Sequence, residues 1–411
     1  MANLTMQLLG AVAKPTGVWE TIIMAFHNGI PNYAWAIIVF TIVIKLVMLP
    51  FDLLNKYVTA KNTRVQALIQ PEVEKIQKQY GNNKQVVNQK TMELYKKHNY
   101  NVTGSCIIML VNMALTLTIF ITLFSGLNSM ASYKVQYQYE EIQKSYYSTV
   151  TDYTNKETVL EDIYVKHYLQ AVNVDNKTAE EAVKYAKEQT KAELELLNSE
   201  TTNLNALNRY NEVKESWLWI DNIWRPDTPW TSSVASFDEY SKSAQATFKD
   251  YTFPIETVSE GETAKTATLS AADLKELSKI EYEQIMNPIK ESAGRENGYL
   301  IIVILAAAMN VLSLLASQGK LKFKKKKKTT LEEEPKQKKS SGIIMLVLLP
   351  ALMAYITLSY NAVFGLYILV SSLVGVASTP LINWLVKLIE TRKENKQKAK
   401  EVVVPYSRKK K

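Results

Sequence analysis

Cysteine and histidine are scarce in this chain of 411 residues, which argues against disulfide bonds and against a metal site. The single cysteine, Cys106, cannot form a disulfide within one chain. The histidines, His27, His98 and His167, lie in different segments, so the sequence does not predict a metal site. No GxxxxGK[ST] motif occurs, which argues against a P-loop nucleotide site. We therefore expect no cofactor.

Residues 1–33 lack the basic n-region of a secretory signal. They contain apolar residues at helical spacing, in a stretch too short to cross a bilayer: Trp19, Ile22, Ile23 and Phe26. This pattern predicts an amphipathic helix lying at a membrane surface, and a disordered leader is the alternative.

Hydrophobic residues are concentrated in five long runs, and most of the remaining chain is charged or polar. A helix needs about 20 mostly apolar residues to cross a bilayer. The runs that reach or approach this length are residues 34–54, 104–127, 298–317, 342–359 and 361–386. The last two runs are almost adjacent, so we expect a tight helical hairpin there. The predicted fold class is an all-α polytopic membrane protein with five transmembrane helices.

Basic residues dominate three of the segments that flank these runs. Lys and Arg outnumber Asp and Glu by 9 to 3 in residues 55–103, by 10 to 3 in residues 318–341 and by 10 to 3 in residues 387–411. Such segments are retained on the cytoplasmic side of a membrane. The N-terminus and residues 128–297, which hold 18 basic and 29 acidic residues, are then expected outside.

The first basic segment predicts a cytoplasmic helical hairpin. Its first arm carries one apolar stripe at spacings of three and four: Val65, Ile69, Val73, Ile76 and Tyr80. Gly81-Asn82-Asn83 then breaks the helix. A mobile arm and a connector that packs on itself fit this pattern equally. The basic runs at 320–328 and 408–411 should be disordered. Anionic lipid and ribosomal RNA are both candidate partners for them.

The predicted outer segment is large, and we expect it to be mostly helical. Residues 133–215 are rich in Tyr, Glu and Lys, and they are candidates to extend the second and third spans. The stretch TFPIETVSEGETAKTATLS, within residues 231–297, predicts a small β element. Its composition indicates no function.

One charged side chain lies inside an apolar run. Lys45 falls within Trp35–Leu54, where a lysine costs about 2.5–3.5 kcal/mol on insertion scales. No Asp or Glu occupies the middle of any run, and Asp52 lies near the end of this one. An unpaired intramembrane cation that faces a hydrated cavity would be a site for transient acidic guests.

Polar residues share faces on several of the runs, which predicts a hydrated groove inside the bundle. Hydrogen bonds between helices are the alternative explanation for the serines and threonines, but they do not explain the lysine. The candidate groove residues are Lys45, Thr41, Ser105, Asn112, Thr116, Asn310, Ser313 and Ser371. We identify no catalytic or metal-binding residue.

Four stretches of the chain match one family pattern when taken together. They are TIVIKLVMLP (41–50), NVTGSCIIMLVNM (101–113), SWLWIDNIWRPDTPW (216–230) and LPALMAYITLSYNAVFGLYILVSS (349–372). They occur in the order found in the YidC/Oxa/Alb membrane protein insertases, which the chain resembles across all five runs. Val102 and Ile108 stand where the family has prolines, and Lys45 stands where the family usually has arginine.

This resemblance implies five helices around a hydrophilic groove that opens to the cytoplasm and to lipid, in a bacterial plasma membrane. The implied function is insertion and folding of nascent membrane proteins without nucleotide hydrolysis, so the protein is not expected to be an enzyme. The implied partners are nascent chains, the ribosome, membrane lipids and, as a further candidate, the Sec translocon. A transporter or channel is the main alternative. A Ser/Lys protease using Ser105 or Ser371 lacks a supporting motif.

Overall fold

The computed structural model describes residues 14–98, 102–244, 248–255, 266–293, 296–317 and 339–402. The chain divides into two compact units. The insertion unit consists of Met1–Ala36, Ser125–Val303 and Ile356–Gly365. The membrane unit consists of Ile37–Phe124, Ile304–Tyr355 and Leu366–Lys411.

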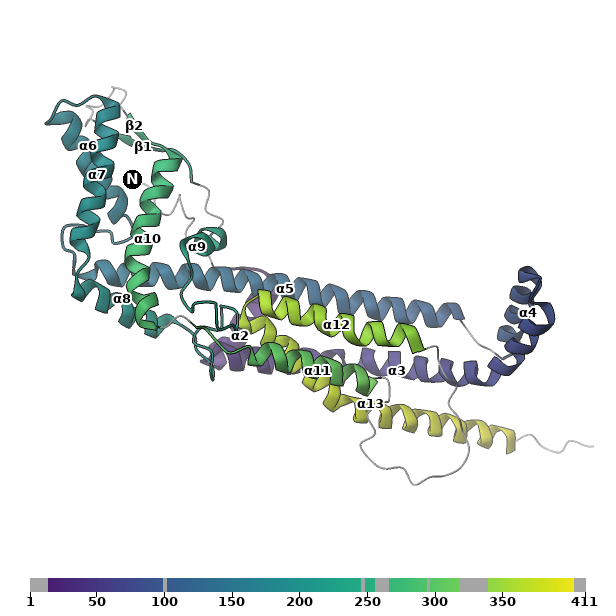
Figure 1. Cartoon of the computed structure of the whole chain (residues 1–411). Coiled ribbons are helices and arrows are strands. Elements are labelled where there is room, and N and C mark those ends of the chain that lie inside the picture. The colour runs from purple at the N-terminus through teal and green to yellow at the C-terminus, as the bar shows by residue number, and fades with distance from the viewer. Residues whose placement is uncertain are drawn as a thin grey trace, which may run out of the picture. The chain divides into compact units, whose positions relative to one another are not determined.

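Long apolar helices dominate the membrane unit (Figure 1). By length and composition, three helices can cross a membrane: α3 (Tyr33–Tyr80), α5 (Val102–Tyr146) and α13 (Ala362–Val402). Two shorter apolar helices, α11 (Ile301–Ser317) and α12 (Lys339–Ser359), coincide with the other two predicted runs. The chain is thus a mostly helical, membrane-embedded protein, and the count of five spans stays a prediction.

Several of these helices continue beyond the apolar runs. α3 extends without interruption from the first run to Tyr80, and it passes through Pro50 and Pro71. α5 continues to Tyr146, which confirms that the residues after 133 extend the second helix. The third apolar helix is not extended in this way, because its preceding residue Leu300 has φ of 64° and interrupts the helical path.

The hairpin predicted after the first run is formed by α3 and α4 (Lys84–Lys97). α3 ends directly before Gly81, and the Asn83 side chain accepts a hydrogen bond from the Val86 N–H (3.2 Å) at the start of α4. A small apolar core joins the two arms, and it confirms most of the predicted stripe. Its residues are Ile69, Val73 and Leu94, with Ile76 and Tyr95 packed against them.

We expect Ile69→Ala to loosen this hairpin. Ile69 is 1% exposed, and removing such a side chain typically costs about 2–5 kcal/mol. Hydrogen exchange of the full-length protein should become faster in residues 66–97. Leu68→Ala is the matched control, because Leu68 is next to Ile69 in the sequence and its side chain is 71% exposed. Equal effects of the two substitutions would contradict a packed hairpin core.

Beyond their apolar portions, α3 and α13 are linked by polar contacts. Arg64 forms an ion pair with Glu390 (2.7 Å). Lys393 donates a hydrogen bond to the Tyr57 hydroxyl (2.7 Å), and its ammonium lies 4.6 Å from the centre of that ring. Such exposed pairs contribute at most about 1 kcal/mol each.

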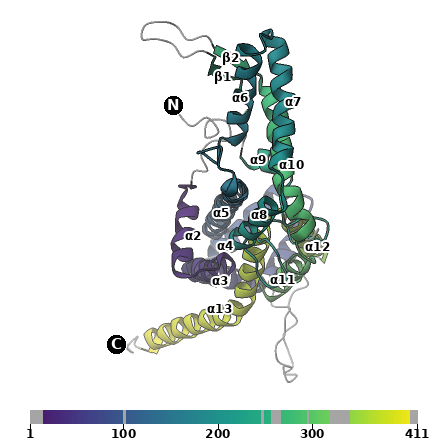
Figure 2. The ribbon, with the colours of Figure 1, turned by 90° about the vertical axis from the view of Figure 1, so that its left-hand side faces the viewer.

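The insertion unit is built mainly from helices that pack side by side (Figure 2). Besides part of α5, its elements are α2 (Val18–Gly29), η1 (Tyr147–Thr149), α6 (Val159–Asn173), α7 (Ala179–Leu197), α8 (Glu200–Val213), α9 (Phe237–Ser243) and α10 (Ala271–Ala293). α10 packs on α6, α7, α8 and α9, while α6 and α7 pack on each other. This arrangement confirms the mostly helical prediction for the segment.

Tyrosines make up much of the insertion unit's core. Tyr146, Tyr147, Tyr164 and Tyr210 are fully buried together with aliphatic residues of α6 and α10. Each tyrosine buries a large apolar ring, and the Tyr147 hydroxyl donates a hydrogen bond to Glu281 (2.9 Å). The tyrosines of residues 133–215 therefore lie in the core as well as on the surface.

Local sequence signals set the ends of three of these helices. Thr178 and Glu181 form a capping box at the start of α7, in which each side chain accepts a hydrogen bond from the other residue's backbone N–H. Ser236 and Glu239 do the same for α9, and Ser199 pairs with Thr202 for α8.

The predicted β element is present as a two-stranded hairpin. β1 (Tyr251–Pro254) pairs antiparallel with β2 (Thr266–Leu269), with Phe253 opposite Ala267. Phe253 and Leu269 are buried in the core of the insertion unit, so the hairpin covers one part of that core.

The predicted amphipathic helix at the N-terminus corresponds to α2. Ile23 is fully buried and Trp19 lies close to Gly126 of α5, so this side packs on protein. Val18 and Ile22 remain exposed. The position of α2 at a membrane surface stays a prediction.

Candidate functional site

Lys45 lies on the less exposed side of α3. Thr41, one turn earlier on the same face, is buried, and Lys45 itself is half-buried. The adjacent residues Leu46 and Val47 are 57% and 65% exposed. In an apolar helix the exposed side chains are those available to lipid. The lysine therefore does not belong to the exposed apolar stripe of this helix.

No hydrogen bond or ion pair joins Lys45 to any residue in the described part of the chain. The acidic side chain whose charge acts on it is Asp52, two helical turns further along α3. An ion pair on a helix requires partners three or four residues apart. The residues at those distances from Lys45 are Thr41, Ile42, Met48 and Leu49, none of which is acidic.

The other candidates on α3 and α5 differ in whether their polar groups have hydrogen-bond partners. The Thr41 hydroxyl donates to the Ile37 carbonyl of its own helix (2.6 Å), so this side chain is internally satisfied. The Asn112 side-chain oxygen is buried and has no partner among the described residues. Thr116, one turn further along, is exposed, and the side chain of Ser105 lies outside the described residues.

α11 and α13 approach each other closely at one candidate, Ser313. A side-chain carbon at Gly375 would lie 3.1 Å from the Ser313 hydroxyl oxygen, so this serine faces the backbone of α13. Ser371, one turn before Gly375, is hydrogen-bonded to the Tyr367 hydroxyl. Asn310 is half-buried, one turn before Ser313. Close packing explains Ser313, whereas the grouping of all eight candidates in one groove stays a prediction.

A loop in the insertion unit holds the beginnings of two apolar helices. The Asp227 carboxylate accepts hydrogen bonds from the backbone N–H groups of Tyr299 (2.9 Å) and Ile302 (2.7 Å). Through Ile302 it satisfies a donor that the first turn of α11 leaves unpaired, and through Tyr299 it holds the residue before that helix. The Arg225 carbonyl accepts a bond from the Ala362 N–H (2.9 Å) at the start of α13.

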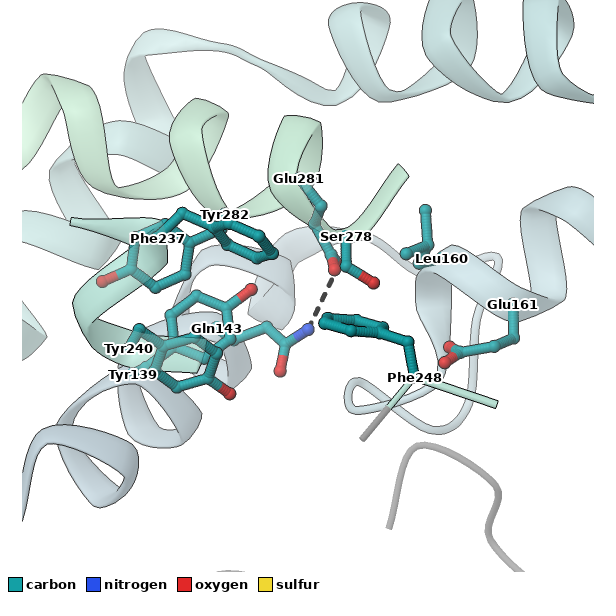
Figure 3. A pocket seen from close by; sticks show the side chains of 10 residues that line it. All are labelled: Tyr139, Gln143, Leu160, Glu161, Phe237, Tyr240, Phe248, Ser278, Glu281 and Tyr282. Atoms are coloured by element: carbon teal, nitrogen blue, oxygen red, sulfur yellow. Dashed lines mark hydrogen bonds between the residues drawn. The ribbon is translucent and has the colours of Figure 1, made fainter. Parts of the chain in front are cut away.

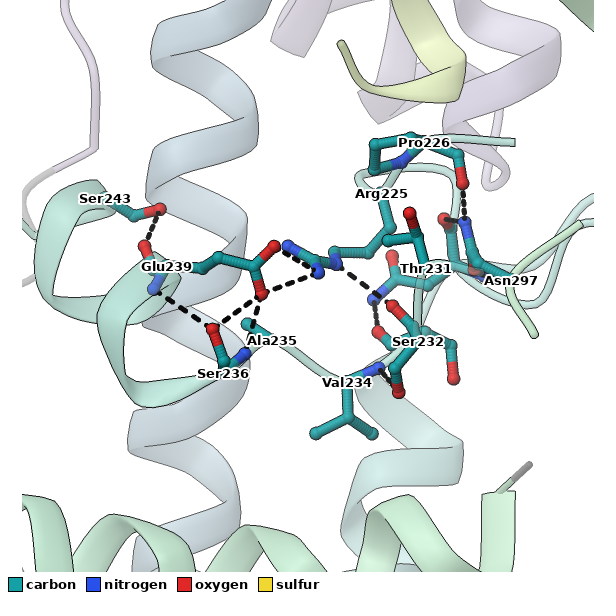
Figure 4. A network of polar contacts seen from close by, with 12 residues as sticks. Arg225, Pro226, Thr231, Ser232, Val234, Ala235, Ser236, Glu239, Ser243 and Asn297 are labelled. Carbon is teal, nitrogen blue, oxygen red and sulfur yellow. Dashed lines mark hydrogen bonds and ion pairs between the residues drawn. The ribbon is translucent and has the colours of Figure 1, made fainter. Parts of the chain in front are cut away.

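Buried side chains fix the shape of this loop (Figure 4). Asn297 is fully buried and donates to the carbonyls of Asn222 (2.9 Å) and Pro226 (2.9 Å). The Arg225 guanidinium donates twice to the Glu239 carboxylate, at 2.8 Å each. Gly298 is required here, because a side-chain carbon would lie 2.0 Å from an Asp227 oxygen.

A buried ion pair lies in the same unit. The Lys134 ammonium is 2.7 Å from a Glu215 oxygen and 4.2 Å from the centre of the Tyr33 ring. Burial raises the pKa of Glu215, and the charge of Lys134 opposes that shift. This pair could not be predicted from the sequence, because its members are far apart and lie in segments without a periodic signal.

Two carboxyl groups face a small cavity inside the insertion unit (Figure 3). Its volume of about 20 Å³ is enough for a single water molecule. Glu281 accepts hydrogen bonds from Tyr147 (2.9 Å) and Gln143 (3.1 Å). Glu161 is 5% exposed, and one of its oxygens has no partner among the described residues.

At neutral pH, Glu161 should be mostly protonated and Glu281 about half protonated, as their raised pKa values imply. Burial, and then the charge of Glu281, raise the pKa of Glu161 to about 8. Burial raises the pKa of Glu281 to about 7, although its hydrogen bonds from Tyr147 and Gln143 act in the opposite direction. The two groups interact, so they titrate as a pair.

We predict that the insertion unit loses stability as the pH rises from about 4.5 to about 8. The folded state binds these protons more tightly than the unfolded state, so deprotonation favours unfolding. Thermal unfolding of the full-length protein in detergent, followed by the near-ultraviolet signal of the tyrosines, measures this. Glu161→Gln should flatten the pH dependence, whereas Glu180→Gln, at an exposed site on α7, should not. An unchanged slope in Glu161→Gln would refute the assignment.

The fold and these sites define a class of protein: a helical membrane protein with an inserted helical unit and an unpaired lysine in one apolar helix. A family model described as 60Kd inner membrane protein matches residues 25–388. The chain therefore belongs to the 60Kd inner membrane protein family, to which YidC and Oxa1 proteins belong. This confirms the family resemblance recognised in the sequence.

Individual relatives match shorter stretches. A membrane protein insertase YidC from Fusobacterium nucleatum is 40% identical over 96 residues, which are 23% of this chain and 45% of that protein. Proteins of the same name from Leptospira interrogans and Clostridium tetani are 39% identical over 97 residues and 38% identical over 92. Those stretches cover 24% and 22% of this chain, and 14% and 40% of the relatives. No solved structure matches.

Proposed function

We propose that this protein is an insertase that helps nascent membrane proteins enter the bilayer and fold. Family membership and the names of the relatives support this reading. The position of Lys45 is the structural observation that carries it: a cation on the inward side of an apolar helix, without a hydrogen bond or ion pair in the described chain.

The proposed site is a hydrophilic groove formed by five membrane helices, open to the cytoplasm and to lipid. Lys45 attracts acidic residues in the short outgoing tail of a client. Asn112 and Thr116 on α5, and Asn310 on α11, offer polar groups that replace lost water. The buried oxygen of Asn112 without a protein partner suits such a wet surface, because leaving it dry would cost about 1–3 kcal/mol.

Burial of the client's apolar segment in lipid supplies the free energy for insertion. Transfer of apolar surface out of water is favourable by roughly 25 cal/mol per Å². Nucleotide hydrolysis is not needed in this scheme. The client leaves the groove sideways, and its acidic tail leaves Lys45 because the attraction is a single, reversible ion pair.

The partners follow from the proposed orientation, with the N-terminus and the insertion unit outside. The hairpin of α3 and α4 receives the client in the cytoplasm. The basic runs at 320–328 and 408–411, which lie outside the described residues, hold the ribosome and anionic lipids close. The Sec translocon is a further proposed partner.

We predict that Lys45→Ala lowers insertion of clients with acidic tails more than insertion of clients with neutral tails. The loss should be about fivefold or more, because an ion pair at about 4 Å is worth about 1 kcal/mol even in water. Protease protection of clients translated in the presence of proteoliposomes measures insertion. Lys45→Arg should retain activity because it keeps the charge.

Lys61→Ala provides the matched control, since Lys61 is an exposed lysine of the same helix beyond the apolar run. It should leave the preference for acidic tails unchanged. If Lys45→Ala reduces the insertion of both client types equally, the lysine does not act on the tail charge.

Direct contact is tested with a photo-crosslinking amino acid at position 45 and stalled nascent chains on ribosomes. The matched control is position 47, where Val47 is 65% exposed on the other side of α3. Crosslinks to the client from position 45, before any from position 47, support entry through the groove. Crosslinks from position 47 alone would place the client on the lipid-facing side and overturn the proposal.

A further inference from the structure

The loop at residues 216–230 lies where three apolar helices begin. Its Ser216 carbonyl accepts a hydrogen bond from the Asn32 side chain (3.2 Å), directly before α3. Asp227 holds the first turn of α11, and Arg225 accepts a bond from Ala362 at the first residue of α13. Apolar runs begin at the level of the membrane interface, so this loop lies at that level.

Leu218 lies at an exposed turn of the loop, in a backbone conformation that is unusual for leucine. Trp217 and Ile220 exchange two backbone hydrogen bonds of 2.9 Å, which closes a two-residue hairpin with Leu218 at its tip. Leu218 has φ of 51° and is 69% exposed. Such a turn ordinarily takes Asn, Asp or Gly. A leucine there is strained and, in water, gains nothing from its side chain.

Tryptophans lie next to this tip, and other exposed aromatic residues belong to the same loop or directly precede α11. The ring of Trp217 lies 6.0 Å from that of Trp35 and 6.1 Å from that of Trp219. Trp35, Trp230 and Tyr299 are exposed, and all of them belong to the insertion unit. We call this group the aromatic rim: Trp35, Trp217, Leu218, Trp219, Trp230 and Tyr299. Tryptophan and tyrosine are enriched where proteins meet the headgroup region of a bilayer.

We propose that the aromatic rim is a lipid-binding edge, with the Leu218 side chain inserted into the bilayer interface at the level where α3, α11 and α13 begin. This location gives the strained leucine an apolar environment. It anchors the loop, and with it the hydrogen bonds that hold the helix beginnings. The inference rests on the membrane-embedded helices and is independent of insertase activity.

A polar hollow beside Trp230 favours lipid over a protein partner. Its volume is about 440 Å³, and its lining residues are Trp230, Ser232, Asn287, Lys290 and Glu291. A wall of this composition suits hydrated headgroups, whereas an apolar peptide would require apolar walls. The exposed indole next to a lysine also matches the pairing of side chains found at membrane surfaces.

The test uses a fluorescent label at the tip. In a Cys106→Ser background, Leu218→Cys is labelled with an environment-sensitive fluorophore, and the full-length protein is placed in phosphatidylcholine–phosphatidylglycerol vesicles. Spin-labelled lipids carry the quencher at the headgroup, at a shallow acyl position or at a deep one. Quenching at 218 should be about twofold or more stronger with the shallow labels than with the deep label, as expected for an interfacial side chain.

Leu196→Cys is the matched control, because Leu196 is 83% exposed on α7 of the same unit, away from the rim. Its label should respond to water-soluble iodide and not to the lipid quenchers. Tyr299→Cys provides a second rim position if the 218 variant does not fold.

Lipid quenching at the rim no greater than at 196 would overturn the proposal. A label at 218 that is shielded from iodide but not quenched by lipid would also overturn it, because a second copy of the chain would then cover the rim.

Discussion

Hydrocarbon cannot solvate an ammonium group, and this constraint limits the environments in which the Lys45 side chain can lie. A lysine in an apolar helix must find a carboxylate, reach the interface with its flexible stem, or face water. The residues three and four positions away from it are Thr41, Ile42, Met48 and Leu49, so its own helix offers no direct ion pair. Its half-buried position beside the exposed Leu46 and Val47 keeps it off the lipid-facing stripe. Two conditions remain, which are water inside the protein, as in the proposed groove, and the membrane interface within reach of the lysine stem.

The same constraint acts on the backbone at the ends of apolar helices. The first N–H groups of a helix have no partner within it, and near a membrane they cannot rely on bulk water. Asp227 supplies the missing acceptor for α11, and its loop is held in turn by the fully buried Asn297. A loop of irregular structure is tolerated there because its own polar groups are satisfied from within. Asp227, Asn222 and Arg225 of the segment before the third apolar helix all take part in these internal hydrogen bonds.

Periodic features could be predicted from the sequence, and contacts between distant segments could not. The stripe of Ile69, Val73 and Ile76 repeats with the helix and identified the hairpin core, because its signal is contained in fifteen residues or so. The alternation of exposed and buried residues in β1 and β2 is also contained within a few residues of each strand. Asp227 and Ile302 meet across 75 positions, and Lys134 and Glu215 across 81, with no local pattern that pairs them. Two local signals were missed, the Thr178-x-x-Glu181 and Ser236-x-x-Glu239 boxes, which mark helix starts directly in the sequence.

Two buried cations of the insertion unit show how charges that stabilise this fold are paired with carboxylates. Lys134 has Glu215 at 2.7 Å and an aromatic ring beneath it, and Arg225 binds Glu239 through two hydrogen bonds. Removing one partner of such a pair leaves an uncompensated charge, so both partners are needed for stability. Lys45 has no such arrangement in the described chain, although its helix is the more apolar setting. A charge that served the fold would be expected to carry its partner with it. A charge left without one, where isolation costs most, is consistent with a partner that comes and goes, which is what a client's acidic tail would be.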